Sequence, residues 1–79
     1  MTAENVSNEE LLIDIGNTER ELKAYEDIRN GFWNLSELPE NEGLQRQKYL
    51  IESNKYDAFY LGCKSFLHKL YEIKAERNL

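Results

Sequence analysis

The chain has 79 residues, of which 41% are hydrophobic, and its formal net charge is −5 at pH 7. A chain this short forms at most one domain, whose core supplies only about 3–5 kcal/mol unless a disulfide, a metal or oligomerisation adds to it. Its one cysteine, Cys63, excludes an internal disulfide, and the negative charge opposes general binding to the phosphate backbone of nucleic acids.

The N-terminal segment, residues 1–10, lacks the basic stretch followed by an apolar run that marks a secretory signal. No apolar window elsewhere approaches the roughly 20 residues that a membrane-spanning helix needs. We therefore expect a cytoplasmic protein without membrane contact, and an unpaired Cys63 agrees with a reducing compartment.

A first helix is predicted over residues 8–30. Ser7 and Glu10 have the spacing of a capping box, in which the serine hydroxyl accepts a hydrogen bond from the Glu10 amide, and Val6 and Leu11 flank it as a hydrophobic staple. Residues three or four positions apart share one face of a helix. The residues expected on the inward face are Leu11, Ile15, Thr18, Leu22, Tyr25 and Arg29.

The segment 31–43 is predicted to connect two helices. Gly31 suits the left-handed conformation that follows a helix, so the first helix is expected to end near Asn30. The connection holds the only proline but is too apolar for a solvated linker. Two interpretations remain open, a cap over the end of the core or an anchor for a protein partner. The apolar residues concerned are Phe32, Trp33, Leu35 and Leu38.

A second, longer helix is predicted over residues 44–77, with possible bends at Ser53-Asn54 and Gly62. Large residues return along it every three or four positions, which defines a seam with Tyr49 at the first core position of a heptad. Glu52 alone interrupts this pattern and is expected to set the register by bonding to a tyrosine or a lysine. The seam comprises Tyr49, Tyr56, Phe59, Cys63, Phe66, Leu70 and Ile73.

Charge is distributed unevenly, because residues 1–43 carry a net −8 and residues 44–79 a net +3. In an antiparallel pair, the heptad assignment places acidic residues of the first helix opposite a basic edge of the second. This predicts an all-α antiparallel helical hairpin with a charge code between its helices. The code would join Asp14 and Glu21 to Lys48, Lys55 and Lys69.

The second helix is apolar over more rows than one partner helix can cover. Tyr60 and Leu67 are expected to extend the seam on one flank, where a second copy of the chain would cover them. The hypothesis is a homodimer that forms a four-helix bundle with the second helices central. The predicted self-association seam is therefore Tyr49, Tyr56, Phe59, Tyr60, Cys63, Phe66, Leu67, Leu70 and Ile73.

No residue set points to catalysis, a metal or a cofactor. His68 and Cys63 lie on different helical rows, and a zinc site needs three or four ligands. The acidic residues lack the paired spacing of magnesium-dependent helical hydrolases. Five tyrosines without a basic groove favour packing over base stacking, so nucleic acid is not an expected partner.

The leading prediction is a small non-enzymatic interaction or assembly module that pairs with itself and with an unidentified protein partner. The alternative is an acidic regulatory inhibitor that occupies a basic, nucleic-acid-binding site on its target. One continuous acidic field would favour the inhibitor, and dispersed or paired acidic residues would count against it. The residues concerned are Glu4, Glu9, Glu10, Asp14, Glu37, Glu40 and Glu42. In composition alone, the short, acidic, Asn- and Lys-rich chain is similar to many bacterial and phage accessory proteins.

Overall fold

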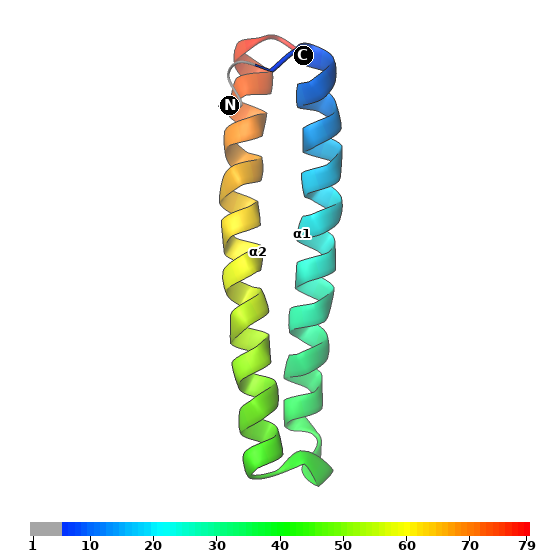
Figure 1. Ribbon diagram of the computed structural model, residues 1–79, viewed down its shortest axis with the longest axis vertical. Helices are drawn as coiled ribbons and strands as arrows, with labels where there is room; N and C mark the ends of the chain where they lie inside the picture. The colour runs from blue at the N-terminus through cyan, green and yellow to red at the C-terminus, as the bar shows by residue number, and fades with distance from the viewer. Residues whose placement is uncertain (1–5) are drawn as a thin grey trace.

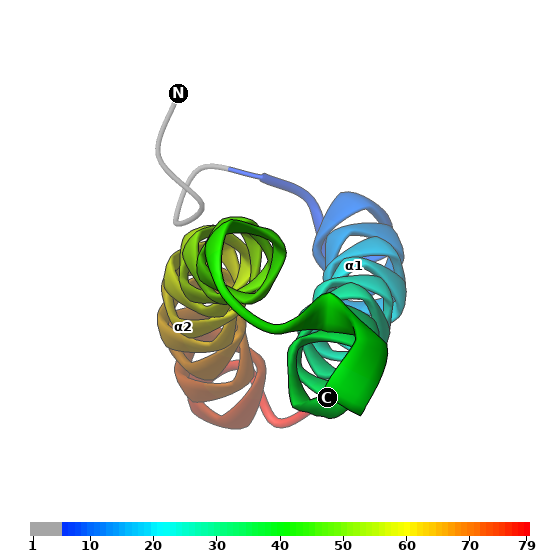
Figure 2. The same ribbon diagram turned by 90° about the horizontal axis from the view of Figure 1, so that it is seen from below.

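Two long helices form an antiparallel hairpin in the computed structural model, which describes residues 6–79 (Figure 1). Helix α1 spans Asn8–Glu37 and helix α2 spans Leu44–Glu76, with the short 3-10 helix η2, Pro39–Asn41, between them. The hairpin is 51 Å long, and the view along its axis shows the two helices side by side (Figure 2). The predicted all-α hairpin is thus confirmed, whereas its assembly into a bundle stays a prediction.

The start of α1 has the hydrogen bond to the Ser7 hydroxyl that the predicted capping box requires. The Glu10 amide donates to Ser7 Oγ at 3.2 Å, and Ser7 has the extended backbone of a helix N-cap. Val6 packs against the buried cluster that contains Leu11, as the staple requires. At the same end of the hairpin Arg77 Nη1 donates to the carbonyl oxygen of Val6 at 2.8 Å, which ties the end of α2 to the start of α1.

The predicted end of the first helix near Asn30 is wrong, because α1 continues to Glu37. Phe32 and Ser36 extend the same inward row by the same spacing, so tertiary packing outweighs the local signal of Gly31. The helix ends where Leu38 precedes Pro39 and is extended, with φ −68° and ψ 133°, as the residue before a proline prefers.

The connection is therefore six residues, 38–43, instead of the expected 31–43. Gly43 has φ +78° and ψ −133° and immediately precedes α2. Helix α1 is 30 residues long and α2 is 33, so the two are nearly equal in length, whereas the expected ranges, 8–30 and 44–77, made the second helix several turns longer. Helix α2 is continuous through Ser53-Asn54 and Gly62.

Alanine at position 31 is expected to stabilise the hairpin by about 1 kcal/mol, because a helical glycine costs that much relative to alanine. A Cβ at Gly31 meets no atom within 4 Å. The matched control is Gly43→Ala, which has equal space but positive φ, and we expect it to cost about 1–3 kcal/mol. Urea unfolding followed by circular dichroism measures both, and a destabilised Gly31→Ala would contradict the observed extent of α1.

Two sets of facing residues hold the helices together, and both repeat every seven positions. In one set Leu11 shares a buried cluster with Leu70, and Cys63 Sγ lies 3.5 Å from the carbonyl oxygen of Thr18. The same set continues with the ring pairs Tyr25–Tyr56 and Phe32–Tyr49, at centroid distances of 6.4 and 6.2 Å. In the second set Ile15 and Leu22 of α1 pack in one cluster with Leu67 of α2, and Arg29 of α1 contacts Ser53 and Tyr60 of α2.

The predicted inward face of α1 is confirmed, but the register of α2 is wrong by one row. Tyr49, Tyr56, Cys63 and Leu70 do face α1. The second inward row begins with Ser53 instead of Glu52 and includes Leu67, which is only 5% exposed. The residues assigned to that row by sequence instead form a flank: Glu52, Phe59, Phe66 and Ile73.

Candidate interaction surfaces

An aromatic ladder fills the half of the hairpin next to the connection. Tyr56 is its centre, with ring centroids 5.9 Å from Phe32 and 5.8 Å from Phe59. Tyr25 lies 5.6 Å from Phe59, and the hydroxyl of Tyr49 accepts from Gln45 at 3.0 Å. Pairs at these separations add about 0.5–1.5 kcal/mol beyond their buried area. The ladder therefore serves the hairpin itself.

Arg29 is the polar link between the helices. Its guanidinium lies 3.0 Å from the carboxylate of Asp57 and 4.6 Å from the ring centroid of Tyr60. Its carbonyl oxygen accepts a hydrogen bond from Ser53 Oγ at 3.1 Å, which explains why a buried serine occupies an inward position of α2. Within residues 6–79 this is the ion pair that joins the two helices.

The predicted charge code between the helices is wrong. Lys48, Lys55 and Lys69 are exposed and lie one row beyond the flank of Phe59 and Phe66, away from α1. The shift in register moves the lysines outward and places the aromatic flank opposite the acidic residues of α1. The uneven charge of the two halves is therefore found mainly on the outer surfaces of the hairpin and not between its helices.

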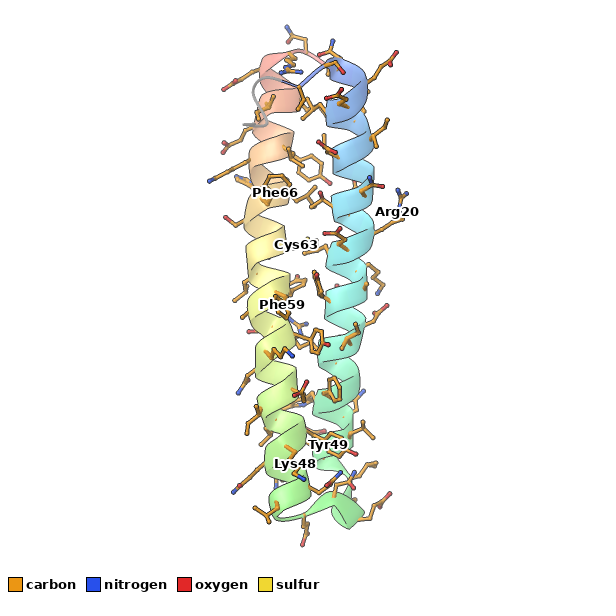
Figure 3. All side chains as sticks on the ribbon, viewed as in Figure 1. Arg20, Lys48, Tyr49, Phe59, Cys63 and Phe66 are labelled. Carbon is orange, nitrogen blue, oxygen red and sulfur yellow. The ribbon has the colours of Figure 1, made fainter. Side chains whose placement is uncertain are left out.

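One side of the hairpin, the Phe59 face, is a shallow hollow between an acidic wall and an aromatic wall. Asp14 and Glu21 line it from α1, and the half-exposed Phe59 and Phe66 line it from α2. Figure 3 shows Tyr49, Phe59, Cys63 and Phe66 following one another along α2, while Arg20 projects from the outer side of α1. Cys63 contributes to the floor of the hollow, where burial raises the pKa of its thiol and the Glu21 carboxylate adds to the effect.

The other side, the Tyr71 face, has apolar side chains mixed with both signs of charge. Leu22 and Leu67 line it together with Leu61 and Tyr71, and Lys64 lies among them. Partial burial raises the pKa of the Tyr71 hydroxyl, and the carboxylate of Glu19 raises it further. Leu61 and Tyr71 are exposed large apolar residues that line this face. By helical spacing the exposed Leu12 and Trp33 of α1, each directly after an inward residue, lie on the same side of the hairpin.

The candidate partner anchor does not form one patch. Phe32 enters the aromatic ladder, which confirms that this residue packs on the core. Trp33, 50% exposed, belongs to the Tyr71 face, whereas Leu35 belongs to the flank of the Phe59 face. Leu38 is exposed at the C-cap of α1. Because α1 continues through this segment, helical spacing places these four side chains on different sides of the hairpin instead of in one loop.

The predicted self-association seam also divides into residues that contact α1 and residues that are exposed. Leu67, Leu70 and Tyr60 contact α1 and are not free for a second copy, so the expected exposed flank of Tyr60 and Leu67 is wrong. Phe59 and Phe66 are the exposed members of the seam. Leu12 and Tyr71 were not predicted as surface residues of interest. Each directly follows an inward residue, Leu11 or Leu70, and this position in the sequence could have indicated them.

Among residues 6–79, no three His, Cys, Asp or Glu side chains lie together in an arrangement suited to a metal ion. Neither helix is long and apolar enough, over the same residues, to cross a membrane. His68 is exposed and its Nε2 lies 3.4 Å from a carboxylate oxygen of Glu72, one turn further along α2. No protein-family model, curated protein or solved structure matches the chain.

Proposed function

We propose that this chain is a small non-enzymatic assembly module that pairs with a second copy of itself to form a four-helix bundle. The observation that carries the proposal is the surplus of exposed apolar surface. Within residues 6–79, thirteen large apolar side chains are exposed, whereas the buried core consists of Leu11, Ile15, Leu67 and Leu70. Exposed apolar surface this large in relation to the buried core is typical of a protein that packs against a partner.

The size of the core supports the same conclusion. Fully burying one leucine or isoleucine contributes about 1.5–3 kcal/mol, which for four residues does not offset the ordering of two helices. The aromatic ladder adds to this, but Phe59 at its edge remains half-exposed. A second hairpin would cover a face that one hairpin leaves open, and oligomerisation is a common source of stability for chains of this length.

Sedimentation equilibrium over protein concentrations from about 1 to 200 µM tests self-association, because a dimer with a dissociation constant in that range changes its apparent mass. We expect the mass to rise from that of the 9.4 kDa chain towards twice that value. Circular dichroism on the same samples reports whether the chain is folded. A fully helical species that keeps the monomer mass throughout would contradict the proposal.

The regulatory inhibitor is less well supported. Glu9, Glu10 and Asp14 lie at the start of α1, whereas Glu37, Glu40 and Glu42 lie at or beyond its other end. The two groups are separated along a hairpin 51 Å long, so they do not form one acidic field in a single copy. Glu4, the seventh acidic residue in that prediction, lies outside the described residues.

A further protein partner remains part of the proposal. Ile13, Leu44 and Ile51 are exposed on outward rows of the helices, away from both faces. Pairing through one face leaves these side chains uncovered. They are therefore the residues that we assign to a contact with another protein.

A further inference from the structure

Building on the proposed self-association, we propose that the second copy covers the Tyr71 face. In this arrangement α1 of one copy packs antiparallel along α2 of the other, and a two-fold axis runs parallel to the helices. Such an axis keeps every residue at its own height along the bundle. The heights within one hairpin therefore fix which residues meet between the two copies.

The facing layers of the hairpin give these heights. Leu11 is level with Leu70, Thr18 with Cys63, Tyr25 with Tyr56 and Phe32 with Tyr49. The residue that follows each of these points toward the Tyr71 face, because one step turns a helix by about 100°. Four pairs then meet between the copies: Leu12 with Tyr71, Glu19 with Lys64, Glu26 with Asp57 and Trp33 with Leu50.

Three of these four pairs are complementary in chemistry. Both outer pairs are apolar, and their exposed members Leu12, Trp33 and Tyr71 would be covered. Glu19 and Lys64 are exposed and of opposite charge, so they attract each other between the copies. The fourth pair, Glu26 with Asp57, is like-charged, but Asp57 is already paired with Arg29 at 3.0 Å, so Glu26 is the one carboxylate among the four pairs that this arrangement leaves without a cation.

The alternative arrangements fit less well. The expected bundle with central second helices would pair the same face with α2 on α2. Helix α1 would then also pack on α1, and Glu19 would approach Glu26 of the second copy. Pairing through the Phe59 face instead brings Asp14 and Glu21 against each other or against phenylalanine rings. Carboxylates buried without a cationic partner oppose association.

The Tyr71 face is also large enough. The hairpin measures 51 by 17 Å in its two longest dimensions, and a face of this size buries on the order of 800 Å² per copy. Stable protein–protein interfaces bury a similar area. The native Trp33 lies at the edge of the proposed contact, so its fluorescence emission is expected to shift to shorter wavelength as the dimer forms.

Charge reversal at Lys64 tests the proposal. We expect Lys64→Glu to raise the dimer dissociation constant by roughly tenfold or more, because Glu19 then faces a like charge. Adding Glu19→Lys to this variant restores opposite charges and is expected to recover most of the lost affinity. The matched control is Phe66→Glu on the Phe59 face, which is expected to leave the dissociation constant within about threefold of wild type. Sedimentation equilibrium and Trp33 emission are the two readouts.

The outcomes separate this inference from the proposed function. A monomeric wild-type chain overturns the self-association itself. A wild-type dimer that Phe66→Glu dissociates and Lys64→Glu does not would keep self-association but overturn the assignment to the Tyr71 face. A dimer insensitive to Lys64→Glu, or a double variant that stays as weak as Lys64→Glu alone, likewise overturns the proposed pairing. Circular dichroism confirms that each variant remains helical.

Discussion

Replacing Leu70 by alanine is expected to leave the chain largely unfolded at 25 °C. Leu70 is fully buried and, within residues 6–79, belongs to a core cluster of four buried apolar side chains. A leucine-to-alanine change in a core costs about 2–5 kcal/mol, which is similar to the whole stability of a chain this short. Helicity measured by circular dichroism at one fixed protein concentration should fall accordingly, and any residual structure should melt without a cooperative transition.

Phe66→Ala is the matched control for this experiment. Phe66 lies one turn before Leu70 and is 48% exposed on the flank of the Phe59 face. The change to alanine at this position removes a larger side chain than the change at Leu70. We expect it to cost less than about 1 kcal/mol, since exposed positions away from packed features tolerate substitution. The register with Phe66 inward would be supported if the two variants lost similar stability.

The inward face of α1 was predictable from sequence because its signals agree. Leu11, Ile15, Leu22 and Tyr25 follow helical spacing, and the capping box fixes where the helix starts. Its end was not predictable from Gly31 alone. Phe32 and Ser36 continue the inward row. The energy of their packing determines whether the helix ends at Gly31 or continues through it.

The register of α2 was ambiguous for a different reason. Two adjacent rows compete to face α1, and the row with Phe59 and Phe66 is the more hydrophobic. The observed row contains Ser53, which is acceptable in a buried position only because the Arg29 carbonyl accepts its hydrogen bond. Sequence patterns carry no information on such a partner from another helix. The predicted charge code was wrong as a consequence of this register.

The same shift explains what could be predicted of the interaction surfaces. The sequence indicated that α2 has more apolar rows than one partner helix can cover. The exposure of Phe59 and Phe66 is consistent with this prediction. The position of the surplus depends on register, so it could not be assigned to a face. The Tyr71 face draws on both helices, and its pairs of equal height follow from the layers of the hairpin.

Phe32 decides between the two interpretations of the segment after Gly31. Phe32 is part of the aromatic ladder, where it stacks with Tyr49 and Tyr56. Its replacement by alanine is therefore expected to destabilise the hairpin by about 2–3 kcal/mol. This is less than the cost of a fully buried phenylalanine, since Phe32 is only partly buried. Urea unfolding at one fixed protein concentration measures the loss as a shift of the midpoint.

The control is Leu35→Ala, three residues later in the same helix and exposed on the opposite side of the seam from Trp33. Its expected cost is below about 1 kcal/mol, because Leu35 is exposed and belongs neither to the buried cluster nor to the aromatic ladder. If Phe32 served instead as a free anchor for a partner, Phe32→Ala would be as well tolerated as Leu35→Ala. Equal midpoints for the two variants would therefore contradict the ladder, whereas a loss confined to Phe32→Ala would place this residue in the fold.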